Sequence, residues 1–202
     1  MLYLPVSTEH LYDGIPSDMN TSARYTRTAV TLHWLAALAI LGTFPLGIYM
    51  SELPLSPRKL QLYSYHKWIG IGVLLLAMLR ILWRMGHRPP PLPGGMPRWQ
   101  VLAAQVAHYG LYLLMLAAPL SGWLMSSALG VSVVWFGVLP LPDLIGKDKA
   151  LGELLKQVHA TLNYTMLAVI LAHVAAAIQH HFFARDEILA RMLPFLKSGL
   201  KP

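Results

Sequence analysis

The sequence predicts an all-α integral membrane protein in which four membrane-spanning helices form a bundle. Composition is the first reason: of the 202 residues, 55% are hydrophobic and only 12% are charged, and the mean hydropathy is +0.50. Soluble domains carry about 25% charged residues. The second reason is that the apolar residues gather in four runs, and each can supply the roughly 20 residues that a membrane-spanning helix needs. A chain so poor in polar residues is not disordered as a whole.

The four predicted spans cover residues 28–51, 63–85, 101–126 and 157–184. The first and fourth contain no formally charged residue. The second has an uncharged centre between Lys67 and Arg80, and it reaches full length only with Arg80 and Arg84 near one end, where long side chains can extend to the membrane surface. The third lies in an uncharged stretch that leaves a buried or interfacial loop up to residue 142.

Proline-containing segments separate these spans, at residues 53–57, 88–97 and 140–142, because proline ends helices. Pro45 and Pro119 lie inside spans and are expected to kink them, which helices in a bilayer tolerate. We expect residues 24–194 to form one membrane domain, residues 1–23 an irregular N-terminal extension and residues 195–202 a C-terminal tail. The extension lacks the pattern of a signal peptide, so we expect translation to begin at Met19 or residues 1–18 to be dispensable.

The basic residues predict the orientation. Ten of the 16 Lys and Arg residues fall on the side of the two termini and six on the other side, so the positive-inside rule places both termini in the cytoplasm. The net charge of +7 arises from residues that flank apolar runs, which argues against a nucleic-acid partner. The absence of cysteine excludes disulfides, iron–sulfur clusters and thioether-attached haem.

Four histidines fall at two matched depths. His159 and His173 are 14 residues apart, which is close to four helical turns, so they share one helix face about 21 Å apart. With alternating helix directions, His33 lies at the inner level with His173, and His66 lies at the outer level with His159. Two imidazoles that face each other across a bundle can hold a haem as its axial ligands, and such ligation suits electron transfer.

The same 14-residue spacing connects His33 with Gly47, His66 with Arg80 and His108 with Gly122. Glycine leaves room for a flat porphyrin where a side chain would collide. Arg80 falls at the inner level, where it can pair with a haem propionate. His108 also falls there and competes with His33 as a ligand.

Several segments together resemble the bacterial cytochrome b561 family: YTRTAVTLHW at residues 25–34, HKWIGIG at 66–72, LRILWR at 79–84, HATLN at 159–163, and AH at 172–173 with HHF at 180–182. The resemblance covers residues 24–194. It implies a four-helix cytochrome of the bacterial inner membrane with two non-covalent b haems, whose iron ligands are His33, His66, His159 and His173. It also implies electron transfer linked to ubiquinone and, for a close relative, oxidation of superoxide with reduction of ubiquinone.

On this reading a small donor such as superoxide delivers electrons on the periplasmic side, and the quinone binds at the inner level. His108 is then expected to contact a propionate or the quinone, and His180, on the same helix face as His173, is expected to contact the quinone. One alternative is a haem b membrane anchor that transfers electrons for a dehydrogenase or hydrogenase complex. Another is a histidine-lined transporter for metal ions. The donor, the acceptor, the haem potentials, the quinone site and the oligomeric state are left open by the sequence.

Overall fold

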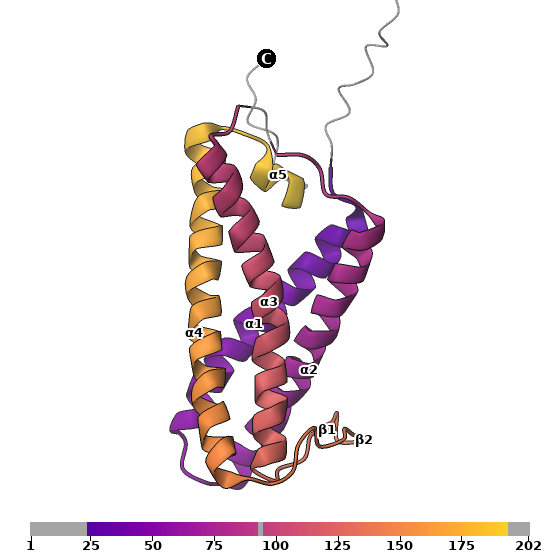
Figure 1. The fold of residues 1–202 in the computed structure, drawn as a ribbon, viewed down its shortest axis with the longest axis vertical. Coiled ribbons are helices and arrows are strands. Elements are labelled where there is room, and N and C mark those ends of the chain that lie inside the picture. Colours follow the sequence, from indigo (N-terminus) through magenta and orange to yellow (C-terminus); the bar gives the residue numbers. More distant parts are fainter. Residues whose placement is uncertain (1–23, 93–94, 194–202) are drawn as a thin grey trace, which may run out of the picture.

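The computed structural model describes residues 24–92 and 95–193, and within them four long helices run up and down in a bundle (Figure 1). They are α1 (Arg27–Glu52), α2 (Pro57–Gly86), α3 (Arg98–Ala128) and α4 (Lys149–Gln179), and α4 continues into the π-helical turn η2 (His180–Ala184). All four are long and apolar enough to cross a membrane. The predicted four-helix membrane fold is therefore confirmed, whereas the predicted extension and C-terminal tail lie outside the described residues.

Side-chain caps explain where three of the helices begin. The hydroxyl of Thr26 accepts a hydrogen bond from the backbone of α1, Ser56 caps α2 in the same way just before Pro57, and the carboxylate of Asp148 caps α4. Such caps satisfy backbone N–H groups that have no partner inside the helix. As a result α2 and α4 begin before the predicted spans 63–85 and 157–184. Hydropathy marks the part of a helix that lies in hydrocarbon, whereas the caps mark where the helix itself starts.

The two internal prolines lie within continuous helices. Pro45 is inside α1 and Pro119 is inside α3. Each removes one backbone donor, and neither ends its helix.

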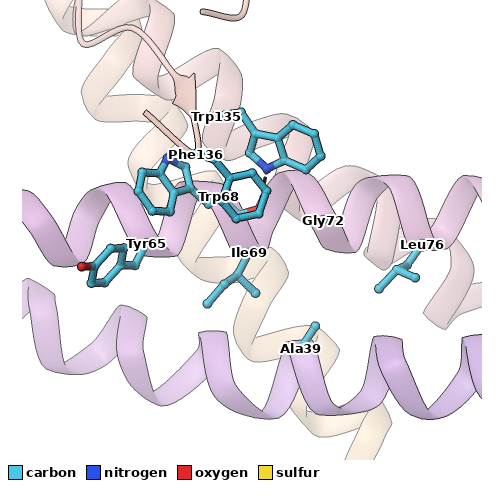
Figure 2. A pocket seen from close by; sticks show the side chains of 8 residues that line it. All are labelled: Ala39, Tyr65, Trp68, Ile69, Gly72, Leu76, Trp135 and Phe136. Atoms are coloured by element: carbon cyan, nitrogen blue, oxygen red, sulfur yellow. Dashed lines mark hydrogen bonds between the residues drawn. The ribbon is translucent and has the colours of Figure 1, made fainter. Parts of the chain in front are cut away.

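A small hairpin occupies the segment predicted as a loop between the third and fourth spans. Strands β1 (Val134–Trp135) and β2 (Leu139–Pro140) pair antiparallel, with Phe136 and Gly137 at positive φ in the turn. The indole of Trp68 on α2 donates to the carbonyl of Val134, and the indole of Trp135 donates to the carbonyl of Trp68 (Figure 2). These two reciprocal hydrogen bonds hold the hairpin against α2. We call this end of the bundle the hairpin end.

The other end of the bundle carries a short fifth helix, α5 (Ile188–Met192), and we call it the α5 end. The chain reverses after η2, where Arg185 adopts a left-handed conformation with φ 54°, and α5 then lies against the inner side of the bundle (Figure 1). The indole of Trp34 on α1 donates to the carbonyl of Met192. Helix α5 is therefore tied to the first helix of the chain.

The bundle has a narrow core and an apolar exterior. The buried core residues are small or slender and come from all four helices: Ala36, Ile40, Val73, Ala77, Leu114, Met115 and Met166. Large apolar side chains point outward along the helices, among them Leu38 and Leu82, both 63% exposed. In a bilayer these side chains contact lipid, so little apolar surface is left in water.

Candidate functional site

Two pairs of histidines lie inside the bundle, one toward each end. Toward the hairpin end, the ring centroids of His66 and His159 are 6.2 Å apart. Toward the α5 end, the ring centroids of His33 and His173 are 6.5 Å apart. The structure thus brings together the residues that depth matching paired from the sequence.

The separation of each pair fits a metal between two imidazoles. A bond of about 2 Å from metal to nitrogen, plus about 1 Å from nitrogen to ring centre, on both sides places the two centroids about 6–6.5 Å apart. His108 also faces His173, but their centroids are only 5.3 Å apart. Distance therefore favours His33 over His108 as the axial partner of His173. The ligand roles themselves remain predictions.

At the hairpin end, His159 is held by hydrogen bonds to its Nδ1 atom. This atom lies 2.9 Å from the carbonyl oxygen of Ala118 and 3.0 Å from the hydroxyl of Ser121. A carbonyl can only accept, so the Nδ1–H group donates to it and the lone pair is on Nε2. This is the usual way in which a second hydrogen bond prepares a histidine for metal binding. The amide nitrogen of Asn163 lies 3.3 Å from Nε2, so a metal bound to Nε2 would take the place of this contact.

His66 completes the pair without a comparable brace. Its Nδ1 atom is buried and has no hydrogen-bond partner among the described residues, and the same is true of the Thr43 hydroxyl. Unpartnered polar atoms inside a protein are costly, and here they lie beside a predicted ligand. The two rings of the pair are therefore held differently.

Glycines make space for both rings at this end. A Cβ atom on Gly47 of α1 would lie 3.0 Å from Cε1 of His66 on α2, and a Cβ on Gly122 of α3 would lie 3.0 Å from Cε1 of His159 on α4. Both distances are tighter than ordinary contact. From the sequence, these glycines were expected to leave room for a porphyrin. In the structure they make room first for the imidazoles.

At the α5 end, a cavity of about 510 Å³ opens beside His33 and His173. Arg80 reaches into it, with a guanidinium nitrogen 3.3 Å from Nδ1 of His33 and its charge 5.2 Å from the ring centre of Tyr112. Arg84 lies over the same tyrosine at 5.8 Å. The side chains that line the cavity and could contact a polar group are Tyr25, His33, Arg80, Arg84, His87, His108, Tyr112, His173 and Arg191.

This lining is cationic and contains no carboxylate among the described residues. Its volume and its arginines suit a flat, largely apolar group that carries negative charge at one edge, as haem does with its propionates. Arg80 lines the cavity at the predicted level. His108 lines the cavity as well, in agreement with a contact role.

His180 does not line this cavity. Its Nδ1 atom lies 2.6 Å from a carboxylate oxygen of Asp186, and the other oxygen of that carboxylate accepts from the backbone of Ile188. His180 thus stabilises the turn that leads into α5. This partner could not be found from the sequence, because the chain reverses immediately after the fourth span. Contact of His180 with the quinone stays a prediction.

Four apolar helices with paired histidines at two levels define a helical membrane protein equipped to hold flat metal-containing groups between its helices. The sequence profile of the prokaryotic cytochrome b561 family matches residues 24–195. The chain belongs to this family. It is a membrane electron-transfer protein, and membership of the family implies haem b as its cofactor.

Three relatives show how close the similarity is. Cytochrome b561 homolog 2 of Escherichia coli (strain K12) is 34% identical over 176 residues, which cover 86% of this chain and 93% of the relative. Cytochrome b561 homolog 1 of the same organism is 30% identical over 182 residues, 85% of this chain and 97% of the relative. A probable superoxide oxidase CybB of Yersinia pestis is 31% identical over 176 residues, 85% of this chain and 96% of the relative.

Proposed function

We propose that the protein is a di-haem cytochrome b that passes electrons from a small donor on the periplasmic side of the bacterial inner membrane to the quinone pool. The observation that carries the proposal is the spacing within each histidine pair. The ring centroids are 6.2 Å apart in His66 and His159, and 6.5 Å apart in His33 and His173. Each gap has the width for one iron. Each of the four histidines would be an axial ligand.

Bound haem supplies one-electron redox chemistry. The protein's own residues set the geometry for it. Because His159 and His173 are 14 residues apart on one helix, the two levels are separated by about 21 Å along the axis. The carbonyl of Ala118 orients His159 through Nδ1. Arg80 would meet a propionate at the α5 end, with His108 beside it.

The electron donor is proposed to act at the hairpin end. Family membership and the similarity to a probable superoxide oxidase support superoxide as this donor. Lysines collect at this end: Lys67 donates to the carbonyl of Val131, and the Lys147 side chain packs against Gly130. Together with Lys59 they would attract a small anion electrostatically.

The quinone is proposed to bind at the α5 end, which the positive-inside rule places toward the cytoplasm. Since Arg80 would be paired with the propionate, His108, which also lines the cavity, can donate a hydrogen bond to a quinone oxygen beside the haem. Two electrons delivered one after the other, with two protons, convert one quinone to a quinol. Ubiquinone is the acceptor that the family resemblance implies.

The test is a spectrum of the detergent-purified protein, oxidised and reduced by dithionite, with haem per chain counted as the pyridine haemochrome. We expect the sharp reduced bands of low-spin haem b at two per chain. Superoxide added to the oxidised protein should then reduce it, and added ubiquinone should reoxidise it. A colourless protein from haem-replete cells would refute the proposal. Reduction only in the presence of a co-purified dehydrogenase or hydrogenase subunit would favour the membrane-anchor alternative.

A further inference from the structure

Helix α5 closes the cavity at the α5 end, although it lies outside the four spans. Its residues Ile188, Leu189, Arg191 and Met192 all line the cavity. It is fixed on one side by the Trp34 indole, which donates to Met192. On the other side Arg191 donates to the carbonyl of Pro91 in the connection between α2 and α3, at 2.6 Å. Helix α5 is thus held in place as a wall of the site.

Arg191 uses only part of its hydrogen-bonding capacity in these contacts. One terminal nitrogen bonds to Pro91, whereas Nε is buried and has no partner among the described residues. A guanidinium has five N–H donors and no acceptor, and a buried donor without a partner costs free energy. The side chain lines the cavity, so an acceptor inside the cavity would satisfy it.

The charges around the cavity specify that acceptor. Arg80 and Arg84 come from α2 and Arg191 comes from α5, and no described lining residue is acidic. Of the two acids nearest in sequence to Arg191, Asp186 is bound to His180, and Glu187 forms no ion pair with Arg191 among the described residues. Tyr25 lies among the same arginines: burial raises its pKa, and the charges of Arg84, Arg191 and Arg80 oppose the increase. Three guanidinium groups without a carboxylate form a site for an anion, and arginine binds carboxylates in a two-pronged geometry.

We propose that Arg191 binds a propionate of the haem held by His33 and His173, so that the segment after the fourth span is part of this haem site. The inference rests on the proposed function and assigns a ligand contact to a residue that the sequence analysis used only for topology. Arg80 and Arg191 would contact the haem edge from different elements. Haem binding would then hold α5 against the bundle.

The experiment compares Arg191→Gln with Arg185→Gln in the full-length protein. Both changes remove one positive charge from the same segment, but Arg185 is exposed and does not line the cavity. Haem per chain is counted first, and the reduction potentials are then resolved by redox titration. For Arg191→Gln we expect the haem content to fall from two per chain toward one. In the haem that remains at this site, we expect about a tenfold shift of the reduction equilibrium toward the oxidised form, which is about 59 mV for one electron.

The outcomes separate this inference from the proposed function. A wild-type protein without haem refutes the proposed function itself. Two haems in wild type, with Arg191→Gln indistinguishable from wild type or from Arg185→Gln, overturn only the role of Arg191. If Arg191→Gln does not accumulate in the membrane, Arg191→Lys is tested by haem transfer to an excess of apomyoglobin. Lysine keeps the charge but not the fork of donors, so one haem should leave several-fold faster than in wild type, and an unchanged rate overturns the inference.

Discussion

Replacing Gly122 with alanine should disturb the histidine pair at the hairpin end while leaving the helix intact. The new Cβ atom would lie 3.0 Å from Cε1 and 3.3 Å from Nδ1 of His159. The ring cannot retreat freely, because its Nδ1 atom is also bonded to the carbonyl of Ala118 at 2.9 Å. The imidazole must therefore shift by a few tenths of an ångström. This shift changes the geometry of its hydrogen bond and the angle at which the ring would meet a metal.

The energetic size of the effect follows from two opposing contributions. Overpacking of a filled interior costs about 1–3 kcal/mol, and replacing glycine by alanine within a helix contributes about 1 kcal/mol in the stabilising direction. Gly110, on the same helix, separates the two contributions because a Cβ there meets nothing within 4 Å. Gly110→Ala gains helix propensity alone, so the two variants should differ by the overpacking cost, about 1–3 kcal/mol.

The assay is the rate of haem transfer to apomyoglobin, together with the low-spin electron paramagnetic resonance spectrum. About 1–3 kcal/mol corresponds to roughly a five- to 150-fold weaker retention of one haem, with altered g-values for that haem only. Gly47→Ala should act in the same direction through His66 but with a smaller effect, because among the described residues no hydrogen bond to Nδ1 holds that ring in place. If Gly122→Ala and Gly110→Ala retain haem equally and give the same spectrum, the glycine does not position the ligand and the reasoning is wrong.

Three further predictions concern single residues. His173→Ala should reduce haem from two per chain to one by pyridine haemochrome, whereas His108→Ala should keep both, because the 5.3 Å separation from His173 is too short for an iron between them; two haems in His173→Ala would exclude this pairing. Ser121→Ala should change the spectrum little, since the Ala118 carbonyl still accepts from His159, and loss of the haem would show that the hydroxyl is the main brace. Asp148→Ala should destabilise the protein by about 1 kcal/mol in thermal unfolding through loss of the α4 cap, without altering haem content.

The fold was accessible from the sequence because hydrocarbon imposes a simple rule on helix length. Residues 28–51 became a helix with nearly the same limits, Arg27–Glu52. The starts of α2 and α4 were not accessible from hydropathy, since charged residues lie in their first two turns and the helices begin at the caps Ser56 and Asp148. The short elements also escaped prediction. Two-residue strands and the five-residue α5 carry no periodic pattern and depend on tertiary contacts.

The histidine pairs could be predicted because helix rise converts sequence spacing directly into depth. Depth alone could not choose between His33 and His108, which fall at one level, and the choice needed their distances to His173. The role of Arg191 needed the chain reversal at Arg185, where the left-handed backbone directs α5 back over the cavity. A basic residue just after a span was interpreted as a topology signal, and sequence alone gives no reason to prefer another reading.

The two proposed haem sites differ in a way that would give electron transfer a direction. At the hairpin end, the Nδ1–H group of His159 donates to a carbonyl, which makes the imidazole a stronger donor to iron and favours the oxidised state. At the α5 end, the lining brings arginines such as Arg80 and Arg191 without a described carboxylate, and positive charge favours the reduced state. Both effects would place the higher reduction potential at the α5 end, so we expect electrons to move downhill from the hairpin end toward the proposed quinone. Redox titration of two single-haem variants, His66→Ala and His173→Ala, assigns the potentials: the haem left in His66→Ala should have the higher one, and the reverse order would contradict this direction of transfer.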